Sequence, residues 1–186
     1  MKSYLLLSFF ASMILLSGCI QTRYITERYI KTNIENHKEG NFSSIKTYSI
    51  FQGASISGGS YLELTGYKNG STKGLVIGAD KIYAARQKFK GDQTLIANIT
   101  FVELSLAQSK SILDKYKLLQ EKIKSEKPII NEEIYIDYTV SKDLFISFKI
   151  SKINRSVTFI DFWIDGEKYH VSTKTIMKKL TKFINY

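Results

Sequence analysis

The sequence predicts an α+β domain in which one antiparallel β-sheet carries two amphipathic helices on one face. Short runs that alternate apolar and polar residues, separated by turn signals, are typical of antiparallel strands. Two other stretches place apolar residues every three or four positions, which is the spacing of one helix face. Because strands and helices are segregated along the chain, we expect the helices to pack on one side of the sheet. The other side would face water or meet a partner.

The first group of predicted strands begins after residue 44. Asn69-Gly70 marks a turn between two of them, and Gly78 is expected to split a weaker strand region in two. The last run of this group is rich in β-branched and aromatic residues, which favour strands. The predicted strands are 45–51, 61–67, 75–77, 81–87 and 94–104.

A helix is predicted over residues 105–125, which contain neither Gly nor Pro. Ser105 and Gln108 have the spacing of a capping box, in which each side chain bonds the backbone N–H of the other residue. The helix should end before Pro128, because the residue before a proline disfavours helical geometry. Its predicted inward face consists of Ile112, Tyr116, Leu119 and Ile123.

A second group of strands follows at 134–140, 144–150, 157–164 and 168–172. Asp165-Gly166 is a strong signal for a two-residue hairpin turn between the last two. The chain closes in a helix over 173–184, with apolar residues on one side and lysines on the other. The order of strands and then a helix occurs twice, but no residue-by-residue repeat accompanies it.

The first 19 residues have the layout of an export signal. Lys2 gives a positive start, residues 4–16 are mostly apolar, and Leu16-Ser17-Gly18 precede the chain's single cysteine, Cys19. The apolar run is shorter than the roughly 20 residues of a membrane span. The segment resembles the lipobox of bacterial lipoproteins. That resemblance implies cleavage before Cys19, a diacylglycerol on its thiol and a palmitate-type acyl chain on its new amino group.

We therefore expect a signal peptide at 1–18, a lipidated N-terminus and tether at 19–43, and a single globular domain at 44–186. Residues of the tether region could instead dock as a first strand or lie at the membrane interface. Two or three acyl chains would hold the protein on a bilayer. Ile20 after the cysteine resembles lipoproteins of the outer membrane; with a single membrane, the protein would lie on the outer face of the cell membrane.

The chain is basic, with a formal charge of +10. Such a charge favours anionic lipid headgroups, lipopolysaccharide or acidic wall polymers, or it is simply carried on a solvated surface. Lysines outnumber arginines 23 to 4, which argues against bidentate phosphate recognition. A nucleic acid partner is not expected at an envelope location.

The sequence predicts no catalytic, cofactor or metal site. His37 lies in the expected tether, and His170 is interpreted as an exposed histidine of the last strand. No serine lies in a Gly-x-Ser-x-Gly elbow, and no thiol remains once Cys19 is acylated. Other weak candidates are the Glu132-Glu133 pair, Asp161 and Asp165 on either side of Trp163, and the Gly58-Gly59-Ser60 turn.

Two surface features are open to functional interpretation. Lys174, Lys178, Lys179 and Lys182 of the last helix could contact anionic lipid, although basic residues near a helix C-terminus also oppose the helix dipole favourably. The aromatic residues around the final hairpin could form a binding surface or fill the core. These aromatics are Phe159, Phe162, Trp163 and Tyr169.

The function expected from these observations is that of a non-catalytic, lipid-anchored envelope protein. It would bind the membrane through the acyl chains on Cys19 and an envelope protein through its domain, as an interaction or assembly module. The alternative is a protein that binds a lipid or another envelope ligand in an apolar cavity between sheet and helices. A filled core with an exposed apolar edge would favour the first, and a large apolar cavity the second.

Overall fold

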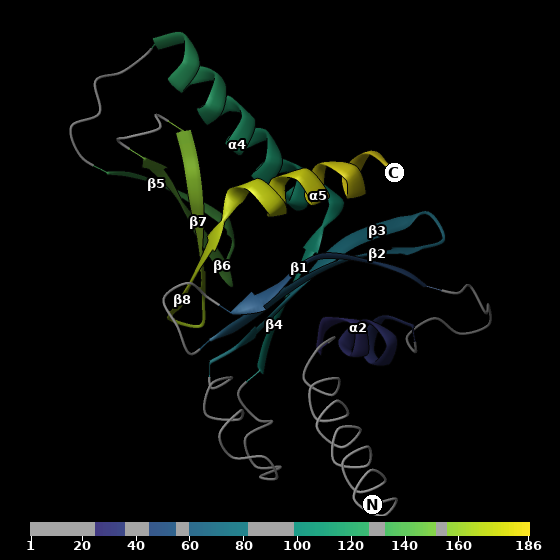
Figure 1. The fold of residues 1–186 in the computed structure, drawn as a ribbon. Coiled ribbons are helices and arrows are strands. Elements are labelled where there is room, and N and C mark those ends of the chain that lie inside the picture. Colours follow the sequence, from purple (N-terminus) through teal and green to yellow (C-terminus); the bar gives the residue numbers. More distant parts are fainter. Residues whose placement is uncertain (1–24, 36–44, 55–59, 82–98, 127–132, 152–155) are drawn as a thin grey trace, which may run out of the picture.

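The computed structural model describes residues 25–35, 45–54, 60–81, 99–126, 133–151 and 156–186. These residues form two antiparallel four-stranded sheets with the orders β1-β2-β3-β4 and β5-β6-β7-β8 (Figure 1). The first sheet consists of β1 (Lys46–Ala54), β2 (Tyr61–Asn69), β3 (Thr72–Asp80) and β4 (Ile99–Ser105). The second consists of β5 (Ile134–Ser141), β6 (Leu144–Ser151), β7 (Ser156–Ile164) and β8 (Glu167–Ser172).

The α+β class is confirmed, but the prediction of a single sheet is wrong. The long helix α4 (Leu106–Glu126) separates β4 from β5, and these two strands do not pair. A helix of its 21 residues spans about 30 Å, so it carries the chain away from the first sheet before the second begins. Alternation along a strand shows which face is buried, but it carries no information on which strand edges meet.

The turn and cap chemistry read from the sequence is confirmed. The backbone N–H of Ser105 donates to Gln108 Oε1 at 2.9 Å, and the N–H of Gln108 donates to Ser105 Oγ at 3.2 Å. Asp165 and Gly166 have φ angles of 51° and 75°, as a two-residue turn with two left-handed positions requires. Local sequence therefore sets where α4 begins and where β7 turns into β8.

Strand β3 differs from its prediction, because it runs without interruption through Gly78. A β-carbon at Gly78 would lie 2.8 Å from Thr26 Cγ2, so the glycine permits close approach of the N-terminal helix. The predicted strand at 81–87 lies outside the described residues, apart from Lys81.

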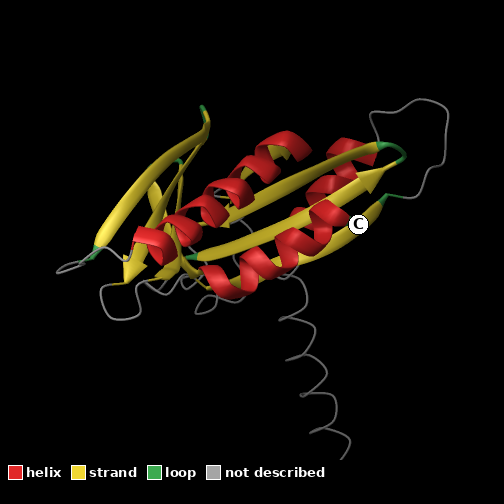
Figure 2. Ribbon diagram, turned by 90° about the horizontal axis from the view of Figure 1, so that it is seen from above, coloured by secondary structure: helices red, strands yellow, loops and turns green. Residues whose placement is uncertain are grey.

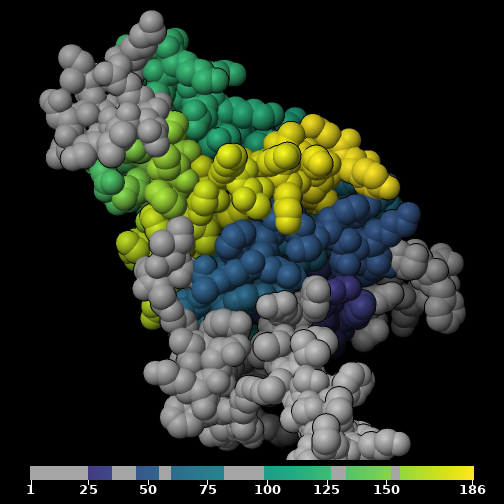
Figure 3. All heavy atoms as spheres, in the orientation of Figure 1, coloured from purple at the N-terminus to yellow at the C-terminus, as the bar shows by residue number. Residues whose placement is uncertain are grey.

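Helices α4 and α5 (Thr173–Asn185) pack against each other and against both sheets. Helix α4 contacts β3 and β4 of the first sheet and β5 and β7 of the second, while α5 contacts β1 and β7. The expected arrangement, two helices on one face of one sheet, is therefore not confirmed. Figure 2 shows the two long helices side by side over the strands, and in Figure 3 α5 forms a continuous strip between the first sheet and α4. One hydrophobic cluster runs through both sheets and both helices.

The C-terminal end of α5 packs against a glycine of the first sheet. A β-carbon at Gly66 would lie 2.6 Å from the ring of Phe183, whose side chain is 3 % exposed. The missing side chain lets the ring lie directly on the strand backbone. Helix α5 is thus held by the second sheet, from which it starts, and by the first sheet, on which it ends.

The N-terminal segment is docked on the other face of the first sheet. Helix α2 (Ile25–Tyr29) continues into a π-helix, η1 (Ile30–Glu35), and Figure 1 shows α2 on the side opposite α5. Ile30 is fully buried against Tyr67 and Val76. Of the alternatives for the tether region, residues 25–35 are docked, but as a helix rather than a strand.

A buried carboxylate fastens this helix to the sheet. Glu63 of β2 has no exposed surface, and its Oε2 accepts hydrogen bonds from the Thr26 N–H at 2.8 Å and the Thr26 hydroxyl at 2.9 Å. The Tyr61 hydroxyl donates to the other carboxylate oxygen at 3.2 Å. Burying a carboxylate is tolerable because these donors replace its hydration.

A second contact joins α2 to the edge strand β4. The Tyr29 hydroxyl donates to Glu103 Oε1 at 2.7 Å, and the Tyr29 ring stacks on Phe101 with the centroids 4.3 Å apart. The hydrogen bond to Glu103, followed by burial, raises the pKa of Tyr29 from 10.0 to about 12. The protonated phenol is therefore the form that the folded protein favours.

We predict that Tyr29→Phe lowers the free energy of unfolding by about 1 kcal/mol at pH 8, because a hydrogen bond to a carboxylate is lost. A raised pKa in the folded state contributes stability that is fully present below pH 10 and is lost as the pH rises toward 12. The difference between wild type and variant should therefore narrow over that range. Urea unfolding at pH 8 and 11.5 measures the difference in unfolding free energy between the two proteins. Ionisation of the other tyrosines affects both proteins equally and therefore does not contribute to this difference. An equal difference at both pH values would contradict the assignment.

Candidate functional site

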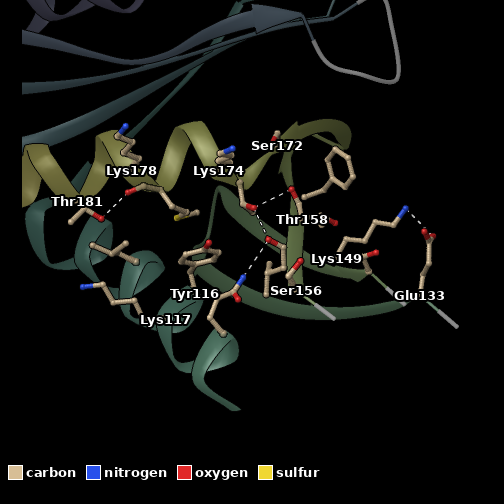
Figure 4. A pocket seen from close by; sticks show the side chains of 17 residues that line it. Tyr116, Lys117, Glu133, Lys149, Ser156, Thr158, Ser172, Lys174, Lys178 and Thr181 are labelled. Atoms are coloured by element: carbon tan, nitrogen blue, oxygen red, sulfur yellow. Dashed lines mark hydrogen bonds and ion pairs between the residues drawn. The ribbon is translucent and has the colours of Figure 1, made fainter. Parts of the chain in front are cut away.

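A groove of about 740 Å³ lies between α4, α5 and the second sheet (Figure 4). Helix α4 contributes residues 113, 116, 117 and 120, a spacing that places them on one helix face. Helix α5 contributes residues 173, 174, 177, 178 and 181 by the same rule. The strands close the groove, mainly with residues 156–159 of β7.

The groove combines apolar side chains with lysines. Its apolar residues are Leu113, Tyr116, Val157, Phe159 and Met177. Its lysines are Lys117, Lys149, Lys174 and Lys178, and its carboxylate is Glu133. The lining is therefore amphipathic and carries a net positive charge.

One lysine of the groove is already paired. Lys149 Nζ lies 2.8 Å from Glu133 Oε2, and the hydrogen bond to this carboxylate raises the pKa of Lys149. Figure 4 shows this pair at one end of the groove and Lys117 with Thr181 at the other. Lys117, Lys174 and Lys178 have no carboxylate within ion-pair distance in the described part of the chain. Three positive charges are thus available to a ligand.

A β-bulge places Thr158 at the groove. In the register of β6 and β7, Lys149 is opposite Phe159 and Ile150 is opposite Val157, so Thr158 has no partner on β6. Bulges redirect a side chain and often lie beside functional sites. The Thr158 hydroxyl is buried, and no group of the described residues forms a hydrogen bond with it.

A side chain of α5 contacts the backbone of the bulge. The Thr173 hydroxyl, in the first turn of this helix, contacts the backbone carbonyl oxygens of Val157 at 2.7 Å and Thr158 at 3.0 Å. The Gln120 side-chain amide donates to the Val157 carbonyl from α4 at 3.5 Å. Both helices therefore contact the backbone of β7 at the bulge.

The outer face of the second sheet carries a row of polar residues, one from each strand. Asp137, Ser147, Asp161 and His170 are paired in this order across β5 to β8. The prediction of an exposed His170 is wrong: its side chain is 17 % exposed, its Nδ1 contacts Asp161 Oδ1, and its ring stacks on Phe159. Asp161 is 2 % exposed, so it is not part of a polar outer edge.

This row does not form a serine nucleophile with a histidine base. The Ser147 hydroxyl donates to Asp137 at 2.6 Å. Ser147 and His170 lie on strands separated by β7, which corresponds to about 9.6 Å at ordinary strand spacing. Hydrogen-bond contact between nucleophile and base needs about 3 Å.

The aromatic residues of the final hairpin divide between core and surface. Phe162 and Tyr169 are buried, which agrees with the core-filling interpretation, and burial raises the pKa of Tyr169. Trp163 is 37 % exposed on the outer face. Trp163 and Asp165 line a hollow of about 590 Å³, and Asp165 also pairs with Lys81 at 2.8 Å. Asp161 does not line this hollow.

The lysines of the last helix also divide. Lys174 and Lys178 line the groove, whereas Lys179 and Lys182 do not. The sequence predicted both helices but gave no sign that α4 lies beside α5 and supplies the opposite wall of the groove. Thr158 and Lys149 were missed altogether, because a bulge in one strand has no recognisable sequence signature here.

Several predicted site residues lie outside the described residues. These are Cys19, His37, Gly58, Gly59 and Glu132. Among the residues that are described, no three His, Cys, Asp or Glu side chains are grouped as metal ligands. In the same part of the chain, no helix is both long enough and apolar enough to cross a bilayer.

Strand β5 forms an edge of the second sheet and is its most exposed strand. Ile134 is 39 % exposed and Tyr135 is 49 % exposed. The strand contains no lysine and no proline, the residues that commonly protect an edge from pairing.

Comparison of the chain with models of known protein families finds no match, and no curated protein sequence matches it.

We predict that Thr158→Val leaves the fold intact and raises the free energy of unfolding by about 1 kcal/mol, because a buried hydroxyl without a partner is replaced by a methyl group of the same size. Thr173→Val is the matched control. It removes a hydroxyl that contacts two carbonyls, and it should lower stability by about 1 kcal/mol. Urea unfolding of both variants tests this; a destabilised Thr158→Val would show that its hydroxyl has a partner.

Proposed function

We propose that the protein is a non-catalytic, lipid-anchored module of the bacterial cell envelope that binds an extended segment of another envelope protein along β5. The observation that supports this is the exposed edge of the second sheet. An extended peptide can pair its backbone with such an edge, while exposed side chains on alternate positions select its sequence. Tyr135 and Ile134 supply the apolar contacts that a partner segment would cover.

The other edges are less suited to strand addition. Strand β8 has only six residues and begins Glu167-Lys168, two charges that oppose pairing. Strand β1 begins with Lys46 and has a register irregularity between Ser49 and Phe51. The side chains of Phe101 and Glu103 in β4 are engaged by Tyr29 of α2. Edge β5 has eight residues, with its irregularity only after Thr139.

The lipid anchor on Cys19 would hold this domain close to a membrane. Helix α2 begins at Ile25, six residues after Cys19, and is fastened to the first sheet through Glu63. Six residues reach at most about 20 Å when fully extended. The domain would thus work at the bilayer surface, on the outer membrane of a two-membrane bacterium or on the outer face of a single cell membrane.

We predict that Cys19→Ser abolishes acyl labelling and moves the protein from the membrane fraction to the soluble fraction. The thioether cannot form without the thiol. Among the described residues, no helix is long and apolar enough to cross the membrane in its place. Metabolic labelling with an alkyne fatty acid, followed by fractionation, measures both effects. Unchanged labelling would contradict the anchor.

We predict that a photocrosslinking amino acid at Tyr135, Asp137 or Thr139 captures one extended segment of a single envelope protein in intact cells. These positions alternate along one face of β5, so mass spectrometry should place the crosslinks on alternate residues of the partner. Tyr135→Lys should reduce capture from position 139 about tenfold, because an edge lysine opposes strand pairing.

The same crosslinker at Lys179 is the control, because this residue is exposed on α5 and lies outside the groove. Capture of the same protein from position 179 with equal yield would contradict strand addition at β5. Crosslinks scattered over several proteins would contradict it as well.

A further inference from the structure

We infer that the groove between α4, α5 and β7 binds a single-chain amphiphile with an anionic head group, such as a fatty acid or a lysophospholipid. This inference does not depend on strand addition at β5, which is a separate surface. The volume of the groove, about 740 Å³, lies within the range of roughly 300 to 1,000 Å³ that is usual for small-molecule sites.

The apolar part of the groove suits an acyl chain. Tyr116 of α4 and Phe159 of β7 are both half-buried and both line the groove. Met177 of α5 also lines the groove, and its unbranched side chain adapts to irregular shapes. A small inorganic anion would leave these surfaces in water, whereas an acyl chain would cover them.

The lysines suit an anionic head group. Lys174 and Lys178 lie one helix turn apart on α5, and Lys117 of α4 lines the same groove. The three lysines come from both helical walls of the groove, so positive charge flanks it on two sides. Because the three side chains are exposed, the attraction should weaken as the salt concentration rises.

Thr158 supplies the remaining polar contact. Its hydroxyl is buried at the groove with no hydrogen-bond partner among the described residues, at a bulge whose backbone Thr173 of α5 contacts. A buried hydroxyl without a partner is unfavourable for folding, so its presence at this position is explained if it binds a ligand oxygen. Only the tertiary structure brings this hydroxyl next to the lysines of two helices.

The experiment uses the full chain with Cys19→Ser, so that its own acyl chains do not compete. Oleate, oleoyl-lysophosphatidylglycerol, oleoyl-lysophosphatidylcholine and inorganic phosphate are titrated below their micellar concentrations and followed by calorimetry. One of the two anionic amphiphiles should saturate a single site, and which of them binds distinguishes a carboxylate from a phosphate head group. The zwitterionic lysophospholipid and free phosphate should bind much more weakly.

Lys174→Gln with Lys178→Gln should weaken binding of the anionic amphiphile about tenfold or more, because charge-assisted hydrogen bonds are lost. Lys179→Gln with Lys182→Gln is the matched control on the same helix, and it should leave the affinity unchanged. Thr158→Val, which is expected to fold, should also weaken binding.

Three results would overturn the inference. Equal affinity for the zwitterionic and anionic amphiphiles would exclude a role for the lysines. An equal loss of affinity in the two double variants would show that the amphiphile is attracted to the basic helix in general and not to the groove. Phosphate binding as tightly as the amphiphiles would show that the apolar lining is not used.

Discussion

The position of α5 is the constraint on which the rest of the structure depends. Its first turn contacts the backbone of β7 through Thr173, and its last turn places Phe183 on the bare backbone at Gly66. These two contacts lie on different sheets, so α5 joins both sheets in one hydrophobic core together with α4. The groove, the bulge at Thr158 and the separation of the lysines all follow from this placement.

The two sheets differ in how many of their faces are covered by helices. The first sheet is covered on one face by the long helices and on the other by α2, which a buried carboxylate holds in place. The second sheet meets the long helices on its inner face and carries the Asp161–His170 pair on its outer face. Of the exposed large apolar residues in the described part of the chain, Ile134, Tyr135 and Trp163 lie on the second sheet, whereas Leu118 lies on α4 and Tyr186 follows α5.

The groove shows a conflict between stability and binding. The Thr158 hydroxyl is buried and has no partner in the part of the chain that the structure describes, and Lys174 and Lys178 place two like charges one turn apart. Both features are unfavourable for the isolated fold. Sites that break local rules in this way are those where binding is expected.

The sequence by itself determined the α+β class, the two long helices and the turns that its local motifs specify. The Ser105–Gln108 cap and the Asp165-Gly166 turn depend on neighbours within four residues, so local chemistry was sufficient to predict them. Only the tertiary structure decided that the strands form two sheets, that β3 continues through Gly78, and that Lys174, Lys178 and Lys117 line one groove. The physical reason is that these features depend on contacts between residues far apart in the chain, and the period of a strand or helix specifies a face without specifying what covers it.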